Sequence, residues 1–173
     1  MTVEIEPNGE VSEEAMADLE EQIGHPLPPD YRAWLTANNG GYIRVGAALP
    51  SVPMYLNVLT QAVDDSGESD LMFERETSEY LTDDYLGINE VDSGLLAVKL
   101  VDPDRGSVWY LDDDDMGLEY DYEQAGYDSE PAYICAEKLQ RVADSFDDLI
   151  ARLVPVADEV ARNLSRGPDP GSE

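Results

Sequence analysis

Two side chains in this sequence carry chemistry used in many catalytic sites, and each residue type occurs only once. His25 lies between Gly24 and Pro26, and an imidazole can serve as a general base or a pH switch. Cys135 could act as a nucleophile only beside a base, but acidic residues surround it in the sequence, and nearby carboxylates raise the pKa of a thiol. We therefore interpret His25 as a turn residue between two helices and Cys135 as a small, buried or half-buried side chain.

Motifs for metals, phosphates and covalent catalysis are incomplete. One histidine and one cysteine cannot supply the usual closed set of zinc ligands. The run Asn39-Gly40-Gly41 lacks the spacing and the lysine of a phosphate-binding loop, and no Gly-x-Ser-x-Gly turn occurs. Carboxylates are so numerous that almost any pair would fit a glycosidase dyad, so this signal selects none. We expect no catalytic residue, no metal and no cofactor, and only a measured turnover would revive an enzymatic function.

One calcium-loop alignment needs a separate test. The twelve-residue pattern places Asp112 at position one, Asp114 at position three, Gly117 at position six and Glu123 at position twelve. Position five fails because Met116 offers no side-chain oxygen, and the preceding residues 108–111 have the pattern of a strand and not of a helix. We interpret this segment as a solvated loop at the end of a strand, with weak, opportunistic calcium binding as the alternative.

Net charge is the most unusual property of the chain. Thirty-nine acidic residues against ten basic ones give a formal net charge of -29. Such a chain disfavours nucleic acid and anionic membranes, because binding DNA requires lysine and arginine to neutralise phosphates. No run approaches the roughly 20 apolar residues of a membrane span, residues 1–10 lack the positive charge of a signal peptide, and a single cysteine cannot form an internal disulfide. We expect a cytoplasmic protein.

The acidic residues gather in two stretches. Between Arg105 and Lys138 lie ten acidic residues and no basic one, and residues 64–92 hold many acids with Arg75 as the single base. Adaptation to salt would spread acids evenly, whereas clustering favours a surface complementary to a basic protein. A solvated face with no partner is the alternative.

Tyrosines are interleaved with the first acidic stretch, and tyrosine is enriched at protein interfaces. The predicted partner-binding residues are the acids and tyrosines at its centre: Asp112, Asp113, Asp114, Asp115, Glu119, Tyr120, Asp121, Tyr122 and Glu123.

The first part of the chain predicts a pair of helices. A helical apolar repeat covers residues 13–23, Ser12 precedes it as a cap, and Gly24 fits the left-handed position at its end. A second helix opens at residues 27–30, with a proline in the first turn, and stops at residues 38–41.

The middle of the chain predicts short strands and loops. Residues 42–45 and 55–59 have strand patterns, residues 61–76 are polar and predict a loop, and residues 77–86 suggest a short helix ended by Gly87. The strongest hairpin signal joins the apolar runs 95–101 and 108–111 through the turn residues between them.

The last part predicts a strand and a helix. Residues 137–142 suggest a strand, Ser145 caps a final helix, and Pro155 should kink or end it before a second piece at 156–164. We predict an α+β fold: a mainly antiparallel sheet flanked by an N-terminal helix pair and a C-terminal helix. Residues 1–164 would form one domain, and residues 165–173 a disordered tail.

These landmarks resemble a known family. The N-terminal combination of Leu19-Glu20-Glu21-Gln22-Ile23-Gly24, Leu27-Pro28-Pro29-Asp30-Tyr31, Trp34-Leu35 and Asn38-Asn39-Gly40-Gly41 resembles the signature of the SUKH superfamily. Later segments at 86–89, 95–100, 106–112 and 142–150 look similar as well, so the resemblance covers roughly residues 15–153. The chain departs from the pattern in the acidic insert at 64–70, in the stretch 112–130 and in the tail after 153.

The resemblance implies an α+β fold and a binding role. The superfamily includes fungal regulators of cell-wall synthesis and many bacterial immunity proteins, which neutralise a cognate toxin by tight association. Many such toxins are nucleases or nucleic-acid deaminases with basic clefts. The signature residues look structural, with Gly24 and Gly40 at helix ends and Trp34 and Trp109 in the core.

Together, the charge and the resemblance predict an immunity protein that binds a toxin with a basic active-site surface. An intracellular scaffold or regulator with no toxin partner is the alternative. The toxin, the binding stoichiometry and the oligomeric state stay open at this stage.

Overall fold

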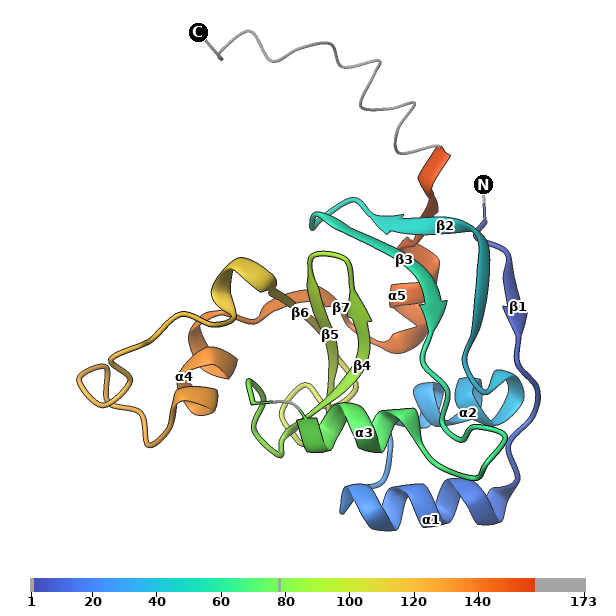
Figure 1. The fold of residues 1–173 in the computed structure, drawn as a ribbon, viewed down its shortest axis with the longest axis horizontal. Coiled ribbons are helices and arrows are strands. Elements are labelled where there is room, and N and C mark those ends of the chain that lie inside the picture. Colours follow the sequence, from blue (N-terminus) through green and yellow to red (C-terminus); the bar gives the residue numbers. More distant parts are fainter. Residues whose placement is uncertain (1, 78, 158–173) are drawn as a thin grey trace, which may run out of the picture.

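A computed structural model describes residues 2–77 and 79–157 (Figure 1). These residues form five α-helices, one short 3-10 helix and eight strands in two antiparallel sheets. The helices are α1 (Glu13–Ile23), α2 (Pro29–Asn38), α3 (Asp70–Thr77), η1 (Asp113–Asp115), α4 (Glu130–Glu137) and α5 (Phe146–Arg152). The strands are β1 (Ile5–Pro7), β2 (Gly41–Leu49), β3 (Met54–Leu59), β4 (Tyr85–Val91), β5 (Gly94–Lys99), β6 (Val108–Asp112), β7 (Gln140–Ala143) and β8 (Val154–Pro155). The predicted α+β class is confirmed, with two sheets where the sequence suggested one.

The first sheet has the order β1–β2–β3, and β8 pairs with the second half of β2. Ile43, Leu49 and Leu56 from its inner face are buried in the main core, together with Phe146 and Leu149 of α5. Figure 1 shows β2 and β3 curving over α5, with α1, α2 and α3 along the lower side of the molecule. One face of this sheet is therefore buried and the other faces solvent.

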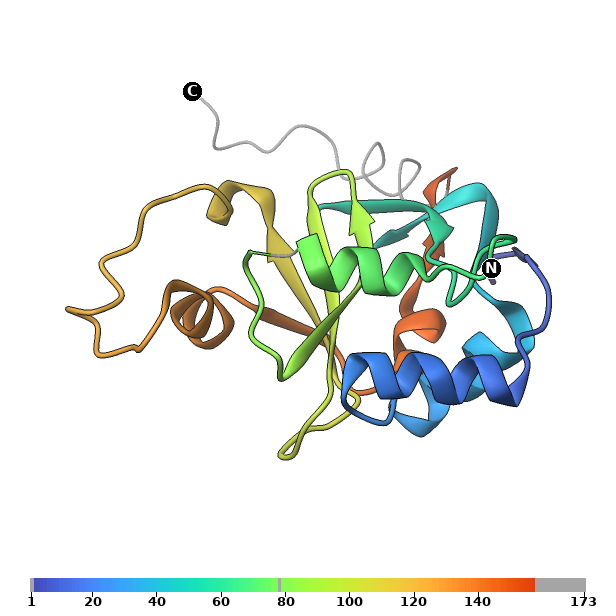
Figure 2. The same ribbon diagram turned by 60° about the horizontal axis from the view of Figure 1, so that its bottom comes forward.

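The second sheet has the order β4–β5–β6–β7 and is covered on both faces. Leu96 and Val98 of β5 belong to the main core, whereas Leu95 belongs to a second cluster with Ile134 and Leu139. Figure 2 shows this sheet between α4 on one side and α1 and α5 on the other. Double-sided burial explains why β5 has an apolar run instead of an alternating pattern.

The N-terminal helix pair forms as its sequence predicts. The Ser12 hydroxyl accepts a hydrogen bond from the Ala15 amide (3.2 Å), and Gly24 ends α1 at a φ of 83°. Arg32 of α2 then joins the two helices through Glu13 (2.9 Å) and Glu20 (3.1 Å). The hydrogen bond from Arg32 also holds the pKa of Glu13 below its usual range.

Asn39 ends α2 and fixes the chain that leaves the first sheet. It adopts a left-handed φ of 47°, a region that asparagine tolerates better than most residues. Its side-chain oxygen accepts hydrogen bonds from the amides of Ala62 (3.0 Å) and Val63 (3.1 Å), and its nitrogen donates to the Val63 carbonyl (2.7 Å). At Gly40, an added Cβ would lie 2.4 Å from the Leu59 carbonyl oxygen, so a side chain there would collide with backbone.

The two sheets meet along a seam that side chains close. The side-chain oxygen of Asn89 on β4, which is only 5% exposed, accepts hydrogen bonds from the Thr60 amide (3.0 Å) and hydroxyl (3.1 Å). Asp92 accepts a hydrogen bond from the Tyr55 amide (2.8 Å). Ser93 in the β4–β5 turn donates its hydroxyl to the Pro53 carbonyl just before β3. Backbone amides along the outer edge of β3 are thus hydrogen-bonded to side chains of the second sheet, although no described strand of that sheet pairs with β3.

Two predictions for the middle of the chain are wrong. Of the predicted helix at 77–86, Thr77 ends α3, residues 79–84 are not helical and β4 begins at Tyr85, so Gly87 lies inside a strand next to a register shift. The predicted loop at 61–76 contains α3, where the Ser69 hydroxyl accepts a hydrogen bond from the Met72 amide (3.3 Å) and Leu71 is fully buried. The apolar residues of this segment are adjacent in the sequence and show no helical repeat, so the pattern did not predict a helix.

The last part of the chain also differs in detail. The predicted strand at 137–142 begins only at Gln140, because α4 extends to Glu137 after an N-terminal cap by Ser129. The predicted cap of α5 by Ser145 is confirmed, with its hydroxyl accepting a hydrogen bond from the Asp148 amide (3.1 Å). α5 ends at Arg152, and the following residues pair with β2 as β8. Most of the predicted helix at 156–164 and the whole predicted tail at 165–173 lie outside the described residues.

The two tryptophans are half-buried and not deep in the core, which corrects the expectation from the family resemblance. Trp34 packs at the margin of the main core against Phe146, with ring centroids 5.0 Å apart. Trp109 packs against the second cluster, and its indole N–H donates to the Ser107 hydroxyl (2.8 Å). An indole needs a hydrogen-bond partner, which favours such marginal positions.

The seam generates the first prediction. Asn89→Ala leaves the Thr60 amide without its partner in a buried site, and should lower the free energy of unfolding by about 1–3 kcal/mol. Urea denaturation measures this change. Asn57→Ala, an exposed asparagine on β3, is the matched control and should change stability by less than about 0.5 kcal/mol. Equal losses in the two variants would show that the seam does not depend on Asn89.

Candidate partner-binding surface

The residues between β6 and α4 form a projecting segment that we call the acidic arm, residues 113–129. Figures 1 and 2 show it extending from the body of the molecule beside α4, at one end of the long axis. The arm contains seven acidic residues and no basic one: Asp113, Asp114, Asp115, Glu119, Asp121, Glu123 and Asp128. It therefore presents a concentrated negative charge away from the rest of the fold.

The arm begins with a capped turn. The carboxylate of Asp112 accepts a hydrogen bond from the Asp114 amide (2.9 Å) and lies 3.4 Å from the Tyr110 hydroxyl, whose proton is donated to the Ser93 carbonyl. The carboxylates of Asp112, Asp113 and Asp114 approach within 4.8 Å of one another. Strand β6 precedes them, so the helical flank of a calcium loop is missing, as predicted from the sequence. Local capping accounts for this arrangement.

Asp115 and Tyr120 anchor the arm to the body. Asp115 lies 3.3 Å from the ammonium of Lys138, which also lies 5.2 Å from the centroid of the Tyr120 ring. The Tyr120 hydroxyl donates to the Asp115 carbonyl (2.9 Å), and its ring packs on Tyr133 of α4 with centroids 4.9 Å apart. The hydrogen bond to Asp115 raises the pKa of Lys138, and burial raises the pKa of Tyr120. These contacts hold the beginning of the arm against α4.

Tyr127 forms a second anchor where the chain returns. Its ring meets Tyr133 edge to face, with centroids 5.4 Å apart, and its hydroxyl donates to Glu137. This hydrogen bond raises the pKa of Tyr127. Tyr133 therefore contacts both limbs of the arm, and the arm is a packed structure and not a loose acidic loop.

The outer part of the arm is a short turn with outward carboxylates. The Gln124 amide donates to the carboxylate of Asp121 (3.1 Å), and the Tyr127 amide donates to the Tyr122 carbonyl (2.9 Å). Residues 119–123 line an open hollow of about 410 Å³. Glu119, Asp121 and Glu123 are exposed. Backbone hydrogen bonds thus present these carboxylates in a defined arrangement.

The nine predicted partner-binding residues divide into two groups. The exposed members are Asp113, Asp114, Glu119, Asp121 and Glu123, with Tyr122 half-buried beside them. The other three are engaged in internal contacts: Asp112 caps η1, while Asp115 and Tyr120 contact Lys138. Sequence reasoning treated Lys138 only as the end of the acidic stretch, because nothing in a linear sequence indicates that it folds back onto Asp115.

The chain matches a protein-family model. The family model described as the SMI1 / KNR4 family (SUKH-1) matches residues 10–152. The chain belongs to this family. No curated protein matches the chain. Among the described residues, no helix is both long and apolar enough to cross a membrane. The match includes both helices of the N-terminal signature, strands β2 to β7 and the whole acidic arm.

Membership in SUKH-1 is compatible with the role of an immunity protein. It confirms the resemblance inferred from the N-terminal signature, in which Gly24 and Asn39 end helices in left-handed conformations. The matched region contains the exposed carboxylates of the arm, so the candidate surface is part of this SUKH-1 domain and not an appendage to it.

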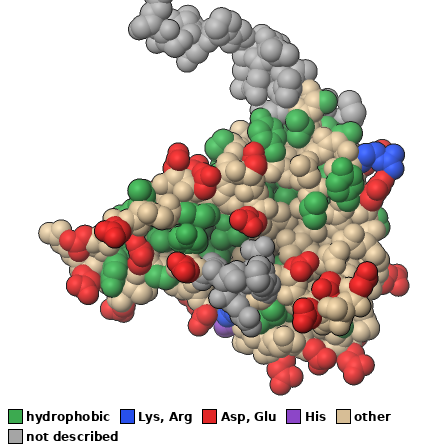
Figure 3. Space-filling view, viewed as in Figure 1, with side chains coloured by type: hydrophobic (Ala, Val, Ile, Leu, Met, Phe, Trp, Pro, Cys, Tyr) green, Lys and Arg blue, Asp and Glu red, His purple; other side chains and the backbone are tan. Residues whose placement is uncertain are grey.

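The second acidic stretch of this SUKH-1 domain is dispersed by the fold. Asp64 closes its own turn, accepting hydrogen bonds from the Ser66 hydroxyl (2.6 Å) and amide (2.8 Å), which lower its pKa. Asp92 is engaged at the seam with Tyr55. Figure 3 shows acidic side chains over the arm and over the lower helices rather than in one continuous field. The arm is the stronger candidate for a docking surface.

The histidine and the cysteine lie in separate elements. His25 is half-buried in the turn between α1 and α2, which confirms its interpretation as a turn residue. Cys135 of α4 is half-buried in the second cluster, where burial raises the pKa of its thiol. A raised thiol pKa lowers the fraction of the reactive thiolate at neutral pH.

The anchor generates the second prediction. Lys138→Met removes the ammonium from both Asp115 and Tyr120, so amide hydrogen exchange across the arm should rise about two- to fivefold, while the sheets keep their protection. Because Asp115 raises the pKa of Lys138 above 10.5, this contact is complete below pH 10.5 and is lost as the pH rises through the raised pKa. The matched control is Lys99→Met, because Lys99 is the other lysine of the chain and its ammonium lies over the Tyr85 ring. Equal rates of amide hydrogen exchange across the arm in both variants would show that Lys138 does not anchor the arm.

Proposed function

We propose that the protein is an immunity protein that neutralises a cognate bacterial toxin by covering its basic active-site surface. Nucleases and nucleic-acid deaminases are the toxin classes that this chemistry fits, because their clefts bind polyanions. The observation that supports the proposal most directly is the ordered arm, on which six exposed carboxylates lie with no basic residue among them. Such a surface resembles the charge pattern of a nucleic-acid strand.

Electrostatic steering is the first step of the proposed mechanism. A net charge of -29 attracts a basic protein over long distances, and complementary potentials raise association rates far above those of neutral pairs. Because the arm projects from the body, its carboxylates can enter a cleft that the rest of the domain cannot. The toxin would thus be blocked at the surface where its own substrate binds.

Slow dissociation needs a different set of contacts. Tyr122 lies half-buried among exposed carboxylates, and Leu118 is 52% exposed in the same arm. Tyrosine is enriched in binding hot spots, and burial of the Tyr122 ring together with the apolar Leu118 of the same arm would exclude water from the charge pairs around them. The anchors at Asp115 and Tyr127 order the arm before binding, so less conformational entropy is lost on association.

The partner is identified by co-purification with the product of the neighbouring gene, followed by growth rescue when the two genes are expressed together. Rescue from a toxic neighbour supports immunity. A stable complex with a non-toxic protein would instead favour a scaffold or regulator, the alternative that family membership also allows.

The third prediction tests the arm as the docking surface. The triple variant Glu119→Gln, Asp121→Asn, Glu123→Gln should slow association with the toxin by at least tenfold at low salt, and should reduce the salt dependence of the rate. Asp112, Asp115 and Tyr120 are left intact, and Asp121→Asn keeps a side-chain oxygen that can accept from the Gln124 amide, so the fold of the arm is preserved. Stopped-flow kinetics at two salt concentrations measure both quantities.

The control for this experiment matches the change in net charge. Glu14, Asp18 and Glu21 are three exposed acids on α1, and their neutralisation alters the overall field by the same amount. This control should slow association by less than about threefold, because only the long-range field changes. Equal effects in the two triple variants would exclude the arm as the docking site, although immunity itself would still be tested by growth rescue.

A further inference from the structure

One part of the chain is free of acidic residues. No aspartate or glutamate lies between Asp30 and Asp64, although acids are abundant before and after this interval. The interval contains most of α2 and the whole of β2 and β3. In a chain with a net charge of -29, the two strands of this hairpin therefore carry none of the negative charge.

Most of the large exposed side chains on β2 and β3 are apolar, with Arg44 and Asn57 as the exposed polar ones. Tyr42, Val45, Tyr55 and Val58 are 49%, 57%, 41% and 52% exposed, and Tyr42 pairs directly with Val58 across the strands. We call these four side chains the β2–β3 face. Among the described residues, the other large exposed hydrophobic side chain is Leu118, in the acidic arm. Figure 3 shows hydrophobic side chains over the region of β2 and β3, away from the acids of the arm.

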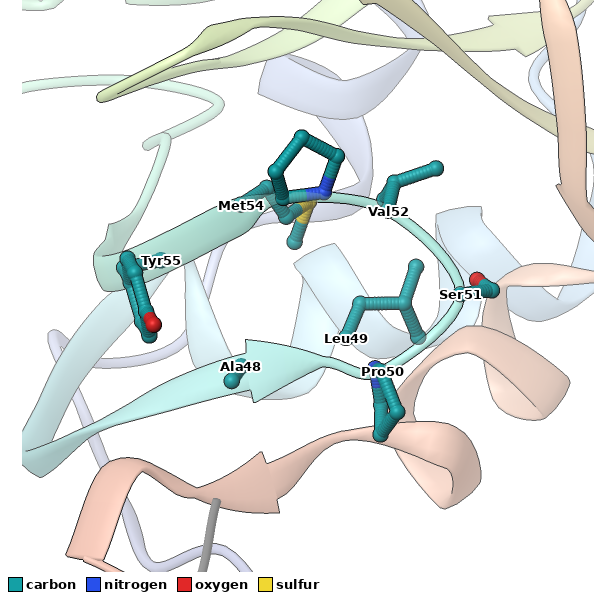
Figure 4. A pocket seen from close by; sticks show the side chains of 8 residues that line it. Ala48, Leu49, Pro50, Ser51, Val52, Met54 and Tyr55 are labelled. Atoms are coloured by element: carbon teal, nitrogen blue, oxygen red, sulfur yellow. The ribbon is translucent and has the colours of Figure 1, made fainter. Parts of the chain in front are cut away.

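The margins of this face carry few charges. Arg44 of β2 pairs with Glu6 of β1, which compensates both charges at that margin, and the exposed carboxylate of Asp92 lies at the Tyr55 end. At the turn of the hairpin, residues 48–55 line a hollow of about 350 Å³ without any charged side chain. Figure 4 shows this hollow with Leu49, Val52 and Met54 around it and Tyr55 on β3.

The strand edges beside this face are already engaged. β2 pairs with β3 on one side and with β1 and β8 on the other. The outer edge of β3 donates its Tyr55 amide to Asp92, and the Thr60 amide just beyond its end donates to Asn89. An additional strand would have to break these contacts, so the face is suited to packing against another surface and not to extension of the sheet.

We propose that the β2–β3 face binds the same face of a second copy of this chain, in a symmetric dimer. Two copies with a charge of -29 repel each other, and the acid-free face is the surface on which close approach carries the lowest electrostatic cost. A two-fold axis brings the same patch of both copies together, and the Arg44–Glu6 pair at its margin adds no net charge to that contact. A basic partner, in contrast, gains no charge pairing from a neutral face.

The size of the face predicts a weak dimer. The four side chains expose on the order of 400 Å² per copy, so the apolar centre is smaller than the roughly 800 Å² per partner of a standard stable interface. Association should therefore depend on protein concentration. It should also strengthen with salt, because screening reduces the repulsion between the two acidic chains. Binding of a basic toxin to the arm should weaken with salt, so the two interactions respond in opposite directions.

The fourth prediction is tested by sedimentation equilibrium of the full chain at about 0.05 M and 0.5 M NaCl, where screening lengths differ severalfold. The weight-average mass should rise from that of the 19.1 kDa chain toward twice this value as concentration and salt increase. Val58→Asp places a carboxylate on each side of the proposed contact and should weaken dimerisation by at least about tenfold. Leu118→Asp, at the same 52% exposure but outside the face, should change it by less than about twofold.

A second variant distinguishes weaker dimerisation from loss of folding. Val45→Thr with Val58→Thr keeps the β-branched shape and removes apolar surface, and should weaken dimerisation by at least about fourfold with an unchanged melting temperature. A monomeric mass under all conditions, or equal dimerisation of the Val58→Asp and Leu118→Asp variants, would overturn the proposal. Loss of toxin inhibition by Val58→Asp in a monomeric protein would also overturn it, and would assign the face to the toxin instead. Because no toxin is present in the mass measurement, its outcome is independent of the proposed immunity function.

Discussion

Repulsion among the acidic side chains is the constraint on which the rest of this structure depends. The chain has only ten basic residues, and several of those in the described part of the structure lie where elements meet. Arg32 joins α2 to α1, and Lys138 joins the end of α4 to η1. Arg141 of β7 contacts Asp104 in the β5–β6 loop (3.2 Å). Arg105, in the same loop, donates to the carbonyls of Pro26 (2.8 Å) and Leu27 in the turn between the first two helices. Exposed ion pairs contribute little stability individually. Their position matters more here, because each cation lowers the repulsion at a junction where two acidic segments are brought together.

Neutral polar side chains complete the junctions that lack a cation. Asn39 fixes the chain after β3, and Asn89 joins the two sheets, in both cases through hydrogen bonds to backbone amides. An amide side chain can accept and donate at once, so Asn39 satisfies both a donor and an acceptor of the backbone without adding charge. Buried unpaired backbone groups are costly, and this cost makes the register of the β4–β5 hairpin against β3 specific. The sheets are thus held in one arrangement, and the arm on the far side of the second sheet inherits a fixed position from them.

Local signals in the sequence predicted the elements with strong caps and double-sided burial, and they were insufficient elsewhere. Ser12, Gly24 and Ser145 mark helix ends through hydrogen bonds or backbone conformations that depend on one or two neighbours, so these ends were predictable. Gly87 misled the prediction, because a glycine at a register shift in a strand looks the same in sequence as a glycine that ends a helix. For the candidate site, residue types alone indicated the acids and tyrosines of the arm. They could not separate exposed Asp121 from Asp115, because that difference depends on the distant Lys138.

The separation of charge also explains how two interactions could coexist on one small domain. Figure 1 places the arm at one end of the long axis, and β2 extends toward the other end. Concentrating carboxylates on a projecting arm increases the local potential that a basic partner meets first. The same charge spread over β2 and β3 would add little to steering and would oppose any contact between copies. A neutral β2–β3 face is therefore the complement of an acidic arm: acids excluded from one surface leave it free for apolar packing, while both arms of a pair still point away from the contact. The two surfaces then differ in the sign of their salt dependence, so ionic strength would shift the balance between self-association and partner binding.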